Sequence, residues 1–177
     1  MDADVLAAAT VCGRRPRRRS GERGQVNLGW TRLAWARLEE LNLNGVSLKS
    51  SYLVGAWLTA TSLRGADLEF ADLTSAQMSL SFLDGANLRR ATLNDAQLRS
   101  ASLVGANLKH TDLRGAHLDG SDLRNADLSD ADLSRATLRN VDVTGALLAN
   151  VKLDGADLTG TDLASARKPP GQAATAV

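Results

Sequence analysis

Cysteine and long apolar runs are almost absent from this sequence, and each absence excludes a class of protein. Cys12 is the only cysteine, so no internal disulfide can form and nothing indicates an oxidising compartment. No apolar run approaches the roughly 20 residues that a membrane-spanning helix needs. The apolar stretch 3–12 is followed by arginines, whereas a signal peptide carries its basic residues first. We therefore predict a cytoplasmic protein without a transmembrane segment.

Signals of catalysis and of cofactor binding are missing as well. The two histidines, His110 and His117, occupy different positions of the repeat described below, and there is neither a P-loop nor an HExxH sequence. Serines are plentiful, but none stands in a recognisable motif with a base. We predict that the chain is not an enzyme and binds no cofactor, metal or small-molecule substrate.

The total charge is small, but it is unevenly distributed. The formal net charge is +1, yet six arginines lie between residues 14 and 23, while residues 26–166 carry 13 basic and 17 acidic side chains. Residues 1–25 are predicted to be an arginine-rich tail or cap, and a contact with an anionic surface such as nucleic acid is the alternative. Residues 167–177, which include Pro169 and Pro170, are predicted to be a disordered tail.

The segment 26–166 has a period of five residues. Its large apolar position, here called i, recurs at every fifth residue from Leu28 to Leu163, and 26 of these 28 positions are leucine, the exceptions being Met78 and Val143. Position i−2 is small in most blocks, with alanine at 16 of 28. Neither a helix nor a straight strand can bury this series on one side, because five residues advance about 500° around a helix and an odd period alternates the faces of a strand.

A chain that turns a corner in every block can bury the whole series. Positions i−2 and i point to the same side of an extended segment, and the three residues between blocks are free to turn. Four blocks then close a coil of about 20 residues, and successive coils stack through backbone hydrogen bonds. Glycine at i+2, as in Gly45 and Gly65, suits a tight corner, and Asp or Asn at i−1 can bond turn amides. The pattern predicts an all-β solenoid of about seven coils of four pentapeptides.

The blocks resemble those of a known family. "ADLEF", "ANLRR", "ADLSD" and "ADLTG" match the A(D/N)LXX pattern of pentapeptide repeat proteins, and the match covers residues 26–166. The resemblance implies a right-handed quadrilateral β-helix. It also implies a possible function, because some members mimic double-stranded DNA, bind DNA gyrase or topoisomerase IV, and protect it from quinolones or other toxins.

The few aromatic residues gather on the outside of the first coils. Residues 20 apart should be neighbours on the wall, and all six aromatic residues occupy outward positions in the N-terminal half. Five of them and one valine fall on one side and form the predicted aromatic surface: Trp30, Trp35, Tyr52, Val54, Trp57 and Phe70. Such a cluster is typical of a contact surface. The alternative is that the apolar segment 5–11 folds back and covers it as a cap.

The C-terminal half is acidic. Residues 111–166 contain ten carboxylates and five basic residues. The 20-residue spacing places carboxylates in columns, which we call the acidic ladders: Asp122, Asp142 and Asp162 in one, Asp112 and Asp132 in the other. Asp at i−1 also serves corner turns, so these residues can be purely structural.

Two functions follow from these features. The first is a protein-interaction scaffold that binds an unidentified protein partner, or a second copy of itself as a homodimer, through its outer faces. The second is the DNA-mimicking protection of gyrase or topoisomerase IV. We favour the scaffold, because the body of the protein is only mildly acidic, residues 14–23 are basic, and no C-terminal helix for the dimerisation seen in those relatives is evident.

Overall fold

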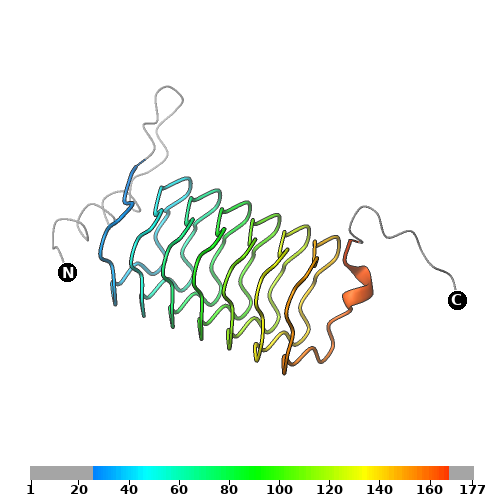
Figure 1. Cartoon of the computed structure of the whole chain (residues 1–177). Helices are drawn as coiled ribbons and strands as arrows, with labels where there is room; N and C mark the ends of the chain where they lie inside the picture. The colour runs from blue at the N-terminus through cyan, green and yellow to red at the C-terminus, as the bar shows by residue number, and fades with distance from the viewer. Residues whose placement is uncertain (1–25, 168–177) are drawn as a thin grey trace, which may run out of the picture.

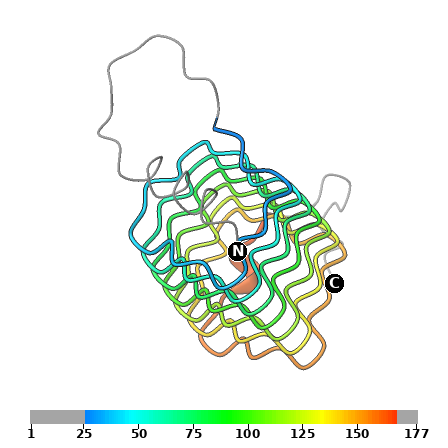
Figure 2. The same cartoon turned by 90° about the vertical axis from the view of Figure 1, so that its left-hand side faces the viewer.

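The computed structural model describes residues 26–167, which form a rod of stacked coils. Figure 1 shows the coils from the side, and Figure 2 shows their four-sided outline end on. Parallel bridges join residues that are 20 apart, beginning with Asn27 and Ser47 and ending with Leu147 and Arg167. Each coil therefore takes 20 residues, as the period predicts. The predicted segments 1–25 and 168–177 lie outside the described residues, and the number of coils stays a prediction.

Each block contributes one bridge residue and one tight turn. In the block of Leu33, the backbone N–H of Leu33 donates to the carbonyl of Tyr52 in the next coil at 2.8 Å, and the N–H of Trp35 donates to Val54 at 2.9 Å. The N–H of Ala36 closes the turn by donating to the carbonyl of Leu33 at 3.0 Å. Each bridge consists of a single residue. The wall therefore consists of tight turns that alternate with single bridged residues.

The interior follows the repeat closely. Every position i from Leu28 to Val143 is buried, and so is every position i−2 from Ala36 to Ala146. The buried hydroxyls find backbone acceptors in most cases: Ser51 donates to the carbonyl of Leu48 at 2.6 Å. The predicted axial core is therefore present, and its dry packing of leucine on alanine is the main source of stability.

The corners are left-handed throughout. Every i+2 residue from Trp30 to Gly160 has a positive φ, between 53° and 76°, although 17 of these residues are not glycine. Asn and Asp tolerate this conformation, but it is unfavourable for bulky side chains by roughly 1–2 kcal/mol per residue. The prediction that glycine suits this position is correct but incomplete, because the stacked backbone imposes the same φ on whatever residue stands there.

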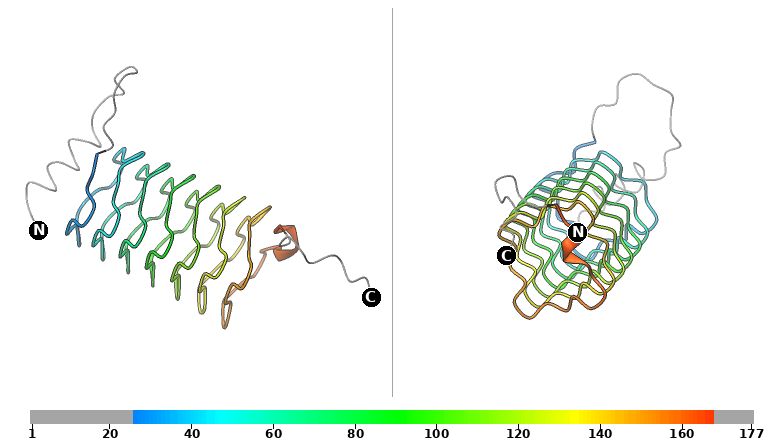
Figure 3. Two further views of the ribbon diagram at one scale, coloured as in Figure 1. Left: turned by 45° about the horizontal axis from the view of Figure 1, so that its top comes forward. Right: turned by 90° about the vertical axis from the view of Figure 1, so that its right-hand side faces the viewer.

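The regular pattern ends before the last predicted block. Residues Leu163–Ser165 form a short 3-10 helix, η1, at the C-terminal end of the stack (Figure 3). The side chain of Asp162 caps this helix by accepting the N–H of Ala164 at 2.9 Å. Leu163 is 37% exposed, and it lines the same cavity at the C-terminal end of the core as Leu148 and Leu158. None of the described residues belongs to a helix that is long and apolar enough to cross a membrane.

Candidate protein-contact surface

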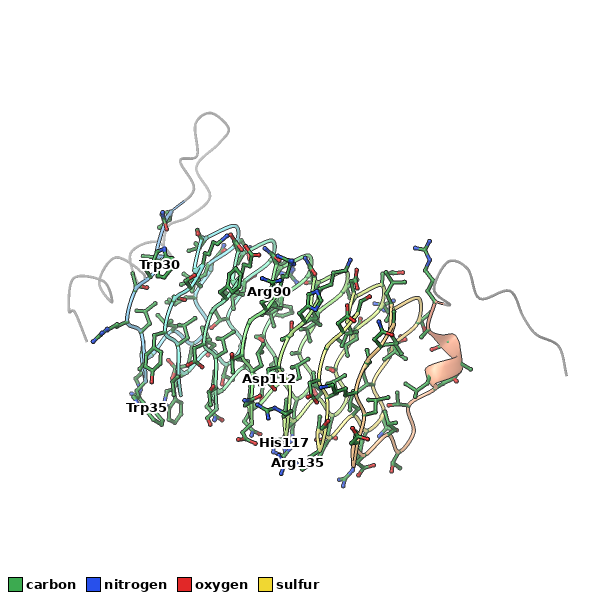
Figure 4. The ribbon with its side chains drawn as sticks, viewed as in Figure 1. Trp30, Trp35, Arg90, Asp112, His117 and Arg135 are labelled. Carbon is green, nitrogen blue, oxygen red and sulfur yellow. The ribbon has the colours of Figure 1, made fainter. Side chains whose placement is uncertain are left out.

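The two tryptophans of the first coil occupy neighbouring corners of the wall. Figure 4 shows Trp30 and Trp35 at opposite edges of one side of the rod. Their side chains are 81% and 66% exposed, the highest values among the large apolar residues that the structure describes. Both have a left-handed backbone, with φ of 61° and 60°. The two indoles therefore project outward from corner residues whose backbone conformation is more favourable for glycine.

Two aromatic residues of the second coil lie directly beside arginines of the first. Bridges pair Arg32 with Tyr52 and Arg37 with Trp57. The guanidinium of Arg37 lies 5.6 Å from the centre of the Trp57 ring, within the range of a cation–π contact. Tyr52 and Trp57 remain 47% and 44% exposed.

The Trp35 ring rests on the backbone of the next coil. A Cβ atom at Gly55 would lie only 2.7 Å from Cη2 of Trp35, so the ring occupies the space that a side chain at residue 55 would need. Val54 is half-buried beside this contact. Glycine at this corner therefore leaves space for the Trp35 ring and also allows the positive φ of 62°.

Phe70 belongs to the same column as Trp30 but has neighbours of its own. Its ring lies between Lys49 and Arg90, whose cationic groups are 5.9 and 5.7 Å from the ring centre. The residues of the predicted aromatic surface therefore lie over two corners and two faces of the first coils. Sequence reasoning missed Arg32 and Arg37, although each follows a tryptophan by two residues in the repeat.

The acidic ladders exist only in part, and arginines lie within them. Bridges join Asp122 with Asp142 and Asp112 with Asp132, but among residues 26–167 no bridge reaches Asp162, which caps η1 instead. The longer ladder of the sequence analysis therefore loses its third member. The cause is local: the chain turns into the 3-10 helix where another bridge residue was expected.

Each ladder begins with a carboxylate held by an arginine in the same block. Arg114 donates two hydrogen bonds to the Asp112 carboxylate, of 2.7 and 2.8 Å. Arg124 donates to the Asp122 carboxylate in the same way, at 2.7 and 2.9 Å. These side-chain hydrogen bonds lower the pKa of both carboxyls below the usual value. Arg124 also lies 3.7 Å from Asp142. The acidic ladders therefore contain arginines between their carboxylates. The Asp-Leu-Arg triplets of the sequence indicate this pairing.

The remaining polar side chains form surface contacts. His117 Nδ1 lies 3.3 Å from the Thr137 hydroxyl, which donates to Asp119, and His110 lies 3.8 Å from Asp130. Over the described part of the chain, no group of three or more His, Cys, Asp or Glu residues is placed to hold a metal ion.

Comparison with known proteins agrees with this architecture. The family model described as pentapeptide repeats matches in eight copies, over overlapping ranges that run from residue 27 to 164. A search of curated protein sequences finds no match.

Several solved structures are similar to this chain. One is HetL, a pentapeptide repeat protein involved in heterocyst differentiation regulation from Nostoc sp. strain PCC 7120, with 32% identity, a TM-score of 0.28, and coverage of 82% of this chain and 77% of that one. A pentapeptide repeat protein from the Arabidopsis thaliana thylakoid lumen has 29% identity, a TM-score of 0.42, and coverage of 61% and 68%. QnrB1, a plasmid-mediated fluoroquinolone resistance protein, has 16% identity, a TM-score of 0.40, and coverage of 81% and 80%.

The repeat, the 20-residue ladder of bridges and the family match lead to one assignment. The solenoid is a right-handed β-helix, and the chain belongs to the pentapeptide repeat family.

Proposed function

We propose that this protein is a non-catalytic scaffold that binds a protein partner through the outer wall of its N-terminal coils. The observation that carries the proposal is the pair Trp30 and Trp35. Exposed indoles gain little from the fold, and a left-handed backbone at a bulky residue costs free energy. Tryptophan and tyrosine are the residue types that contribute most to protein interfaces, because they bury much area at little entropic cost. A partner that covers them would recover the apolar area that the rod leaves in water.

A site-specific crosslinker tests this proposal. A photoreactive phenylalanine analogue is placed at Trp35 in one variant and at Ser100 in a control. Ser100 is an exposed corner residue with the same left-handed backbone, at a different position around the coil. We expect a discrete crosslinked product in cells from position 35, including a dimer if the partner is a second copy, and none from position 100. Equal products at both positions, or none at position 35, would rule the surface out.

The second candidate function is DNA mimicry directed at gyrase or topoisomerase IV. The acidic C-terminal half supports it, with ten carboxylates and five basic residues over residues 111–166. The arginines bound to Asp112 and Asp122 weigh against it, because a DNA mimic needs a continuous run of negative charge. If it is correct, the purified protein changes gyrase supercoiling, and Asp122→Asn with Asp142→Asn abolishes the change. No effect of the parent protein over a wide concentration range would remove this function.

A further inference from the structure

Most basic side chains on this rod lie close to carboxylates, but in the described part of the chain Arg90 and Arg135 have no carboxylate within 4.0 Å, and neither has Arg32 of the first coil. Beyond it, nine basic side chains lie within 4.0 Å of an acidic partner: Lys49, Arg64, Arg89, Arg99, Lys109, Arg114, Arg124, Arg139 and Lys152. Among residues 26–167, Arg32 has no carboxylate within that distance. Arg37 reaches only Glu39, at 4.0 Å, with 77% of its side chain exposed.

These two arginines belong to a tandem unit. Trp30-Thr31-Arg32 and Trp35-Ala36-Arg37 occupy the same block positions, five residues apart. Each unit has an exposed corner indole, an arginine two residues later, and an aromatic residue of the next coil whose backbone is bridged to that arginine. We call this set the tandem Trp-Arg surface: Trp30, Arg32, Trp35, Arg37, Tyr52 and Trp57.

The chemistry of each unit fits an apolar group next to a carboxylate. An indole covers a hydrophobic side chain, and a guanidinium binds a carboxylate through two parallel hydrogen bonds. Residues 26–65, which form the first two coils, contain four basic and two acidic residues, so this part of the rod has a net positive charge that attracts acidic molecules. In most other blocks the rod supplies its own carboxylates to its cations, whereas here only Glu39 comes within 4.0 Å, at Arg37. Carboxylates of another molecule can therefore bind both arginines.

We propose that the tandem Trp-Arg surface binds an extended acidic segment of the partner protein, with apolar side chains on the two indoles and carboxylates on Arg32 and Arg37. This inference rests on the proposed scaffold function and names the chemistry of its partner. Two units at a fixed spacing select for a segment that repeats the apolar–acidic pair, because engagement of one unit raises the effective concentration at the other.

A single-stranded nucleic acid is the competing ligand, since it also combines negative charge with groups that stack on aromatic rings. The charges of the body favour the peptide. Residues 66–85 carry four carboxylates and no basic side chain, so a polyanion would meet repulsion when it extended beyond the second coil. A short acidic peptide can bind both arginines without leaving the surface.

The experiment is a selection from a random 12-residue peptide library displayed on phage, against the full chain. We expect the enriched peptides to combine carboxylates with aromatic or large aliphatic residues. A selected peptide, labelled for fluorescence anisotropy, should bind Arg32→Glu/Arg37→Glu at least about tenfold more weakly, because reversal turns two attractions into repulsions. The control is Arg135→Glu, a charge reversal at a corner without a carboxylate within 4.0 Å in the described part of the chain. It should bind like the parent, and thermal melting confirms that all variants fold.

Several results would overturn the inference. Peptides without net negative charge, an unenriched library, or equal binding by the double variant would each do so. Binding of oligo(dT) that depends on Arg32 and Arg37, with no enriched peptide, would favour nucleic acid instead. If the crosslink from position 35 depends on Trp30 but survives Arg32→Glu/Arg37→Glu, the scaffold function stands and the acidic partner is wrong.

Discussion

Gly55 allows a test of how firmly the rod positions Trp35. Replacement by alanine has two separable effects. Alanine at a φ of 62° is strained, and its methyl group would collide with the indole, since the Cβ would lie 2.7 Å from Cη2. Gly105 provides the matched control, because it has a φ of 64°, the same place in its block, and nothing within 4 Å of a Cβ atom.

The two effects differ in size. The backbone term is shared by both substitutions and amounts to roughly 1–2 kcal/mol. The second term applies only to Gly55. The exposed fraction of Trp35 is 66%, so about a third of its surface is covered. If a free tryptophan presents ~250 Å² and covered area is worth ~25 cal/mol per Å², displacing the ring costs at most roughly 2 kcal/mol. We therefore expect Gly55→Ala to be more destabilising than Gly105→Ala by up to about 2 kcal/mol.

A double-mutant cycle isolates the contact. Urea unfolding is followed by circular dichroism for Gly55→Ala and Gly105→Ala, each in the parent and in a Trp35→Ala background. In the Trp35→Ala background both glycine substitutions should cost the same. Gly55→Ala in the parent should also increase acrylamide quenching of tryptophan fluorescence. Equal destabilisation by both substitutions in the parent chain would show that the indole does not rest on Gly55.

Three further predictions concern the core, the charge pairs and the C-terminal end. Leu98→Asp should unfold the rod or lower its melting temperature severely, because an unpaired charge on the dry axis costs several kcal/mol; unchanged melting would refute the axial placement. Hydrogen bonds from Thr159 and Arg139 lower the pKa of Asp157 to about 2, so the stability linked to it is lost only as pH falls from about 3.8 toward that value. Arg139→Gln should raise this pKa, measured by carboxyl NMR titration; an unchanged titration would contradict the ion pair. Asp162→Ala should lower the melting temperature by removing the cap of η1, whereas Asp162→Asn should preserve it; equal effects would argue against capping.

The fold was predictable because one geometric argument applies to every block. A period of five fits neither a helix nor a strand, and a leucine at nearly every position i leaves only a common axis. The buried series from Leu28 to Val143 confirms this placement. The end of the regular pattern was not predictable from the same argument, since Leu163 fits the repeat by residue type. The chain nevertheless forms a 3-10 turn there, which the Asp162 side chain caps.

The wall was harder to predict than the core. Spacing gives the column in which an outward residue lies, but it does not say which neighbour the side chain binds. Asp122 and Asp142 lie in one column as expected, yet Arg124 stands between their charges. The repeat register predicts that Trp30 and Trp35 are exposed. The contact of Trp35 with Gly55 depends on the rotamer of the indole, which the repeat does not determine.

The division of the block into inner and outer positions separates stability from recognition. Positions i−2 and i are buried along most of the rod, so they determine whether it folds. The remaining three positions project outward, and their side chains can change with little effect on the core. Corner residues are the exception, because the positive φ at i+2 applies a cost to any bulky side chain. Two tryptophans at consecutive corners therefore bear that cost twice within one coil. They lie next to Arg32, which has no carboxylate within 4.0 Å in the described part of the chain, and Arg37, which reaches only Glu39 at 4.0 Å. Stability of the fold accounts for neither feature, and this is why we propose an acidic segment of a partner as the ligand of this surface.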